Sequence, residues 1–131
     1  MSEESNGSPL LSPLPAEHTY ARVTGWIYLL LAAAGAFTDH LWHMITLSSP
    51  MTLMHLAIGV AGLSVARQGK HRAHRTYSLT VGFVFMLWGI AGTFYPQYIN
   101  PRPLPLENAL HLITGMWGFY GVGSILFSKR A

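Results

Sequence analysis

Apolar residues fill four long stretches of this chain, at positions 23–37, 51–66, 76–95 and 106–128. Together these stretches contain one charged residue, Glu107, which stands at the start of the last stretch. A helix needs about 20 residues to cross a hydrocarbon core of about 30 Å, and the last two stretches reach that length. The pattern predicts four membrane-spanning helices, of which the first two are short.

Proline, glycine and polar residues mark the ends of these helices. Pro50 suits the first turn of the second helix, where a missing N–H group costs nothing, and Gly69 suits the cap that ends it. Residues 1–17 are rich in Ser, Pro, Gly and Glu and show no apolar periodicity. We therefore expect residues 1–20 to form a disordered tail and residues 21–131 to form the four-helix domain.

The two halves of the chain resemble each other. Residues 21–69 match residues 76–128 with an offset near 57 positions. The matched pairs are Tyr20 with Tyr77, Gly25 with Gly82, Gly35 with Gly92 and Phe37 with Phe94. Each half contains two spans, so both halves would enter the membrane in the same direction. We expect an all-α fold, an integral membrane four-helix bundle built from two parallel-repeat helical hairpins.

The pattern HLxxGxxG occurs twice, at residues 55–62 and 111–118. On an ideal helix the histidine and both glycines of each copy fall on one face. These residues are His55, Gly59 and Gly62 in the second span, and His111, Gly115 and Gly118 in the fourth. Small residues on one stripe let two helix backbones approach closely in lipid, so we expect the second and fourth spans to cross along these stripes.

Polar residues near the two histidines offer partners for them and for the helix ends. Glu107 lies four residues before His111 and could pair with it on one helix face. Thr52 and Asn108 each precede a motif histidine by three residues and could cap the start of their own helix. On this interpretation His55 and His111 are satisfied polar groups that fix the register of the helices.

An alternative interpretation gives the histidines a ligand. Ionisable residues inside membrane spans are functional candidates, and His55 and His111 could ligate a haem b from both faces if the glycines left room for the porphyrin. His40 and His43 stand at the outer end of the first span. Since zinc accepts imidazole ligands, a metal site formed by His40, His43, His55 and His111 is a further alternative.

The charge distribution indicates how the chain lies in a membrane. Half of the residues are hydrophobic and 10% are charged, a composition far from that of soluble proteins. Basic residues cluster between spans two and three and after span four, at Arg67, Lys70, Arg72, Arg75, Lys129 and Arg130. By the positive-inside rule this connection and both termini face the cytoplasm, so the net charge of +3 does not indicate nucleic-acid binding. The chain has no cysteine, which excludes disulfides and thiolate metal sites.

The segments HLAIGVAGLSVAR, at residues 55–67, and PLENALHLITG, at residues 105–115, resemble a family of small bacterial four-span membrane proteins, domain-of-unknown-function family 4383. The resemblance extends over residues 22–127, although Thr52 replaces an Asn that the family pattern favours. It implies the four-span fold and a place in the bacterial inner membrane. It implies no activity, because none is established for the family.

These patterns lead us to expect a non-enzymatic integral membrane protein whose partner is the lipid bilayer. Its role would be structural, or that of an accessory subunit that docks other membrane subunits or a second copy through glycine-bearing helix faces. The alternatives are a haem- or metal-binding redox protein that uses His55 and His111, and a transporter formed by dimerisation of the bundle.

Overall fold

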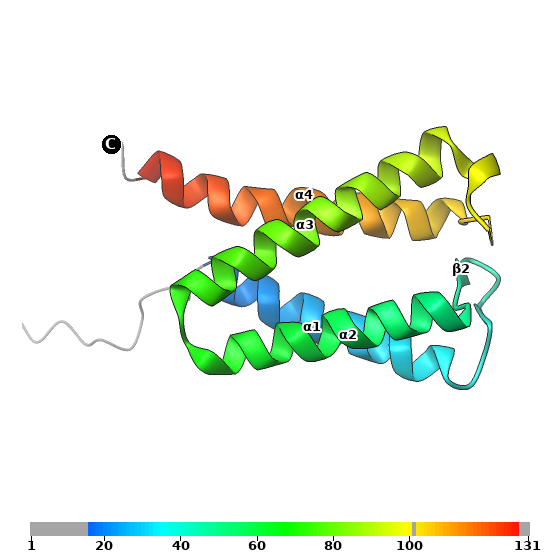
Figure 1. Cartoon of the computed structure of the whole chain (residues 1–131), viewed down its shortest axis with the longest axis horizontal. Helices are drawn as coiled ribbons and strands as arrows, with labels where there is room; N and C mark the ends of the chain where they lie inside the picture. Colours follow the sequence, from blue (N-terminus) through cyan, green and yellow to red (C-terminus); the bar gives the residue numbers. More distant parts are fainter. Residues whose placement is uncertain (1–15, 101, 129–131) are drawn as a thin grey trace, which may run out of the picture.

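The computed structural model describes residues 16–100 and 102–128, which form four long helices joined by short connections (Figure 1). The helices are α1 (Ala16–Gly35), α2 (Ser49–Gln68), α3 (His71–Phe94) and α4 (Pro105–Ser128). A two-stranded ribbon, β1 (His40–Leu41) and β2 (Ile45–Thr46), lies between α1 and α2, and a 3-10 helix, η2 (Pro96–Tyr98), follows α3. The predicted four-helix, all-α fold is confirmed.

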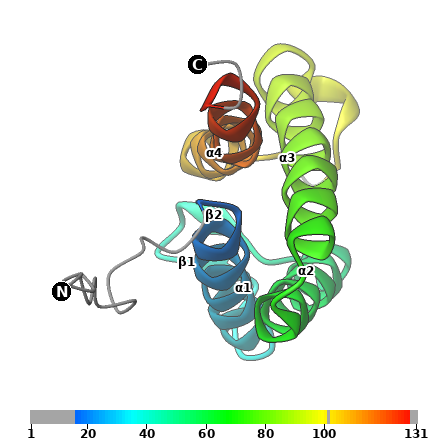
Figure 2. The same ribbon diagram turned by 90° about the vertical axis from the view of Figure 1, so that its left-hand side faces the viewer.

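The helices form two hairpins that pack against each other. α1 runs along α2 and α3 runs along α4, whereas the contacts between the hairpins are less extensive. The start of α1, the α2–α3 connection and the end of α4 gather at one end of the molecule, and the ribbon and η2 lie at the other (Figure 1). Seen from the first of these ends, α1 and α2 form one pair and α3 and α4 the other (Figure 2). α1 and α3 therefore run in the same direction.

Helix α1 begins earlier than the apolar pattern predicts. Residues 16–20, which we expected in the tail, are helical, and Tyr20 is fully buried. The Tyr20 hydroxyl donates a 3.0 Å hydrogen bond to the carbonyl oxygen of Thr114 in α4, and its ring packs against Trp117. These contacts give the first turns of α1 a buried face, so the helix extends beyond its apolar stretch. The rest of the expected tail lies outside the described residues.

The connection between α2 and α3 is shorter than expected, because we expected it to contain the whole basic cluster. Gly69 ends α2 in the left-handed conformation, with φ at 64°, as its position predicts, and Pro50 lies in the first turn of the same helix. α3 begins at His71 and includes Arg72 in its first turn. Most of the basic residues placed between the second and third spans are therefore helical, with Lys70 in the turn itself.

The sequence does not predict the ribbon between α1 and α2, because its four paired residues are too few to show an alternating pattern. β1 and β2 pair antiparallel, with His40 opposite Thr46. Trp42 and His43 in the turn adopt φ angles of 47° and 57°, a region that non-glycine residues seldom occupy. The N–H group of Thr46 donates a 3.3 Å hydrogen bond to the Glu107 carboxylate, so the ribbon ties the first hairpin to the start of α4.

Polar residues are buried between the helices, and large apolar residues cover their outer faces. The buried polar side chains include Thr24, His55, Ser78, His111 and Thr114, with at least one on each helix. The exposed apolar side chains include Trp26, Leu30, Leu53, Phe83 and Ile113. Among the described residues, α2 and α3 are long and apolar enough to cross a membrane. The interior also contains apolar side chains such as Leu31 and Phe85, so it is the outer surface, with large apolar side chains on every helix, that departs from the one expected in water.

Replacing Tyr20 by Phe tests the contact that orders the start of α1. The substitution keeps the ring packing and removes the hydrogen bond to α4, so we expect a loss of about 1 kcal/mol in the free energy of unfolding. Tyr120→Phe is the matched control, because Tyr120 is 72% exposed. Reversible unfolding in mixed detergent micelles measures both variants. Equal stability of the two would contradict the role given to this hydrogen bond.

Candidate functional site

His55 of α2 and His111 of α4 lie side by side where the two hairpins meet. They belong to the two copies of the HLxxGxxG pattern, and the structure leaves 1% of His55 and none of His111 exposed. Their ring centroids are 6.3 Å apart. The two histidines singled out by the motif therefore share one buried site.

Two further rings complete this site. Tyr28 of α1 lies 5.2 Å from His55, measured between ring centroids. Phe85 of α3 stacks on His111 at 4.9 Å, and Tyr28 stacks on Phe85 at 4.6 Å. We call Tyr28, His55, Phe85 and His111 the ring cluster. Sequence reasoning missed Tyr28 and Phe85, although they are 57 positions apart (85 − 28), which is the offset between the two halves.

The first glycine of each motif sets how closely the helices approach within a hairpin. A Cβ atom on Gly59 would lie 2.7 Å from the backbone nitrogen of Leu29 in α1. A Cβ atom on Gly115 would lie 2.8 Å from the backbone nitrogen of Met86 in α3. Each stripe therefore faces the partner helix of its own hairpin. The expected crossing of the second and fourth spans along these stripes is wrong, because small residues predict a close approach without saying which helix makes it.

The second glycine of each motif leaves room for a tyrosine from the other hairpin. A Cβ atom on Gly118 would lie 2.9 Å from the Tyr20 hydroxyl, and one on Gly62 would lie 2.5 Å from the Tyr77 hydroxyl. The Tyr77 hydroxyl donates a 3.1 Å hydrogen bond to the carbonyl oxygen of Ile58 in α2, as the Tyr20 hydroxyl does to α4. The two tyrosines thus join the hairpins from both sides.

Glu107 does not pair with His111. Its carboxylate accepts the hydrogen bond from the backbone of Thr46, and the ring nitrogens of His111 have no hydrogen-bond partner among the described residues. The expected pair is wrong because the ribbon, which the sequence does not predict, supplies a backbone donor to the carboxylate.

Thr52 and Asn108 do not cap their helices as expected. The Thr52 hydroxyl donates a 3.2 Å hydrogen bond to the carbonyl oxygen of Leu47. Asn108 is the fourth residue of α4, and its side-chain oxygen has no hydrogen-bond partner in the described part of the chain. Both side chains fill the space beside a glycine of the neighbouring helix, Thr52 at Gly35 and Asn108 at Gly92.

The structure does not bring together the four histidines considered as a metal site. His40 and His43 stack on each other at the exposed ribbon, with ring centroids 6.3 Å apart, whereas His55 and His111 are buried. In residues 16–100 and 102–128, no three His, Asp or Glu side chains lie close enough to hold a metal ion. An ion at the ring cluster would have His55 and His111 as its imidazole ligands.

The ring cluster does not fit a haem b. A porphyrin held by both imidazoles would extend sideways into the space around them, and Tyr28 and Phe85 fill that space in stacked contact at 4.6 Å. The motif glycines leave no further room, because the backbones of the adjacent helices occupy the positions where their side chains would be.

The four ring nitrogens of His55 and His111 have no hydrogen-bond partner among the described residues. A neutral imidazole carries one donor and one acceptor, and leaving such a group buried without a partner costs about 1–3 kcal/mol. Two imidazoles with centroids 6.3 Å apart can share one small polar guest. A water molecule or a single metal ion has the right chemistry.

The comparisons with known proteins give no relative of this chain. The sequence matches no protein-family model, and neither a curated protein nor a solved structure is significantly similar to it. The resemblance to family 4383 therefore remains a prediction.

Gly115→Leu is expected to prevent α3 and α4 from packing, because the new side chain would begin 2.8 Å from a backbone atom. Overpacking against backbone gives an expected loss of about 3 kcal/mol or more in the free energy of unfolding. Gly123→Leu is the control, since no described atom lies within 4 Å of its Cβ position. Thermal unfolding and gel filtration in detergent measure the effect. A Gly115→Leu protein as stable as its control would contradict the packing described for α3 and α4.

Proposed function

We propose that the protein is a non-enzymatic integral membrane protein, a four-span bundle made of two duplicated hairpins, with a structural role in the bilayer. The observation that carries this proposal is the apolar outer surface of the bundle. Large apolar side chains face outward on every helix, for example Leu30, Leu53, Phe83 and Ile113, which are 56–65% exposed. Lipid is the solvent in which such a surface is stable.

The interior supports the same proposal. Each helix contributes polar side chains to the core, and the hydroxyl of Tyr28 bonds that of Thr114 across the hairpins at 2.9 Å. In lipid, polar groups are expected to face the bundle interior and bond across helices, because no water is available outside. The matching contacts of Tyr20 and Tyr77 at positions 57 apart (77 − 20) support the duplication.

The positions of the basic residues support an orientation. Arg22, Arg67, Lys70, Arg72 and Arg75 are exposed on the first turns of α1 and around the α2–α3 turn. These segments lie at one end of the bundle (Figure 1). By the positive-inside rule this end faces the cytoplasm of a bacterial inner membrane, with both termini on that side. Lys129 and Arg130, which sequence analysis placed there as well, lie outside the described residues.

The burial of the glycine-bearing helix faces favours a structural role over the docking of another subunit. The sequence suggested that these faces bind another subunit, yet Gly59, Gly62, Gly115 and Gly118 are all buried inside the bundle. An accessory subunit would have to use the outer apolar faces instead. These faces carry large side chains on all four helices, as a surface surrounded by lipid requires.

Cysteine accessibility tests the membrane proposal and its orientation. The natural chain has no cysteine, so single cysteines report without background. Gln68→Cys lies at the basic end, and Asn100→Cys lies beyond η2 at the other; both positions are exposed. We expect a membrane-impermeant maleimide to label Asn100→Cys in intact cells and Gln68→Cys only after permeabilisation.

Extraction completes this test. The protein should stay in the membrane pellet at alkaline pH in carbonate and be released by detergent. Release by carbonate would overturn the membrane proposal. Labelling of Gln68→Cys alone in intact cells would overturn the orientation.

A second candidate function is the binding of one metal ion by His55 and His111. The observation that favours it is the set of four buried imidazole nitrogens without a partner among the described residues. Imidazole suits copper and zinc as a ligand. The protein would contribute two fixed ligands and an apolar surrounding.

Metal analysis of purified protein after loading with copper or zinc tests this candidate. We expect about one bound ion per chain, lost in His55→Gln and in His111→Gln, because two imidazole ligands act together. His40→Gln is the control, since His40 lies on the exposed ribbon. Retention of the ion in both core variants, or no binding by the natural protein, would exclude this function.

A further inference from the structure

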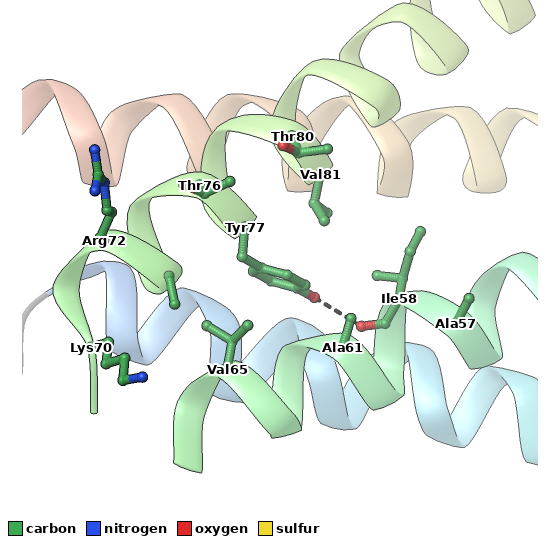
Figure 3. A pocket seen from close by; sticks show the side chains of 11 residues that line it. Ala57, Ile58, Ala61, Val65, Lys70, Arg72, Thr76, Tyr77, Thr80 and Val81 are labelled. Carbon is green, nitrogen blue, oxygen red and sulfur yellow. Dashed lines mark hydrogen bonds between the residues drawn. The ribbon is translucent and has the colours of Figure 1, made fainter. Parts of the chain in front are cut away.

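A groove with a volume of about 670 Å³ lies between α2 and α3 on the outside of the bundle (Figure 3). Small apolar side chains form most of its walls, among them Ala57, Ala61 and Val65 from α2 and Ala73 and Val81 from α3. Lys70 and Arg72 both line one end of it, beside the turn that joins the two helices, with the Arg72 side chain directed away from Lys70 (Figure 3). The groove is therefore apolar along its length and cationic at one end.

The groove exists because α2 and α3 are consecutive in sequence but belong to different hairpins. The turn at Gly69 and Lys70 sends α3 away from α2, and the two helices diverge from there (Figure 2). The Tyr77 hydroxyl bonds the carbonyl oxygen of Ile58 and so holds α3 to α2 within the groove (Figure 3). The side chains at positions 57, 61 and 73 are alanines, which are too small to fill the groove around this contact.

We propose that this groove binds an anionic phospholipid, with one acyl chain along the alanine wall of α2 and the phosphate at the end of the groove that Lys70 and Arg72 line. The proposal rests on the membrane location proposed above. The groove and the lipid would be complementary in charge, because two exposed cations border an apolar groove at the end proposed to be cytoplasmic, where anionic headgroups lie. Basic pockets between membrane helices on this side bind such headgroups.

The length of the groove matches the thickness of one leaflet of the bilayer. Ala57 lies 11 residues before the end of α2 at Gln68 (68 − 57), which corresponds to a rise of about 16 Å along the helix. One leaflet of a hydrocarbon core is about 15 Å thick, half of about 30 Å. A headgroup at the α2–α3 turn would therefore place its acyl chain along the full length of the groove.

Native mass spectrometry of the full chain in detergent tests the headgroup site. The probes are phosphatidylglycerol and phosphatidylcholine with identical acyl chains. A basic side chain near the membrane surface changes lipid affinity by about five-fold, so we expect phosphatidylglycerol to bind roughly 25-fold more tightly. Lys70→Ala with Arg72→Ala should remove this preference. Arg75→Ala is the control, because Arg75 is exposed on the same helix and does not line the groove.

A second variant tests the acyl-chain site. Ala61→Phe fills the groove from an exposed position, and Val60→Phe places the same ring on the adjacent, 51% exposed position outside it. We expect Ala61→Phe to weaken both lipids at least ten-fold and Val60→Phe to leave them unchanged. Circular dichroism of both variants checks that the helices persist.

Several outcomes would overturn the proposal. Equal affinity for the two lipids, or an equal loss in Arg75→Ala and Arg72→Ala, would show only diffuse attraction to the basic end. Unchanged lipid binding in Ala61→Phe would show that no chain enters the groove. A dimer that Ala61→Phe disrupts without lipid would assign the groove to a second copy of the chain. Each of these results leaves the protein in the carbonate-resistant pellet, whereas failure of the membrane proposal releases it.

Discussion

The close approach of two helix backbones at the motif glycines is the constraint on which the rest of the structure depends. At Gly59 and Gly115 the neighbouring backbone occupies the place of a side chain, so the two helices of each hairpin lie as close as helices can. His55 and His111 stand one turn before these glycines on the same faces. The close helix approach at these glycines therefore determines where the two imidazoles meet, between the hairpins and beside Tyr28 and Phe85.

The hairpins themselves are held together by side-chain contacts, both ring stacking and hydrogen bonds, rather than by close backbone packing. Tyr20 and Tyr77 each donate a hydrogen bond to a carbonyl oxygen of the opposite hairpin, over the second glycine of the motif. In the membrane proposed for this chain, lipid would provide no hydrophobic force between helices, so packing and hydrogen bonds of this kind would supply the stability. On the outer side α2 and α3 diverge from the turn that joins them, and the groove lies between them (Figure 2).

Sequence periodicity identified the buried face of each motif helix but not the helix that covers it. His55 and His111 were recognised because a repeated polar residue in an apolar stretch is rare, and the structure places them together. The partner of the glycine stripes was predicted wrongly, because spacing along one helix carries no information about its neighbour. The ribbon was missed because four paired residues have no periodicity, and with it the hydrogen bond that takes Glu107 away from His111.

The sequence repeat could in principle predict the positions of Tyr28 and Phe85. The chemical difference between these two residues is informative. They occupy equivalent positions, 57 apart, and so do Ile58 and Thr114, 56 apart (114 − 58). Tyr28 bonds the hydroxyl of Thr114, whereas the matching positions in the other direction hold Phe85 and Ile58, which carry no hydroxyl.

A buried hydroxyl without a partner costs about 1–3 kcal/mol, so a tyrosine paired with isoleucine, or a phenylalanine paired with threonine, would be unfavourable in this core. At these positions the two halves of the bundle therefore differ in a pair of residues rather than in a single residue. This pairwise difference keeps the buried Tyr28 hydroxyl bonded across the interface between the two hairpins.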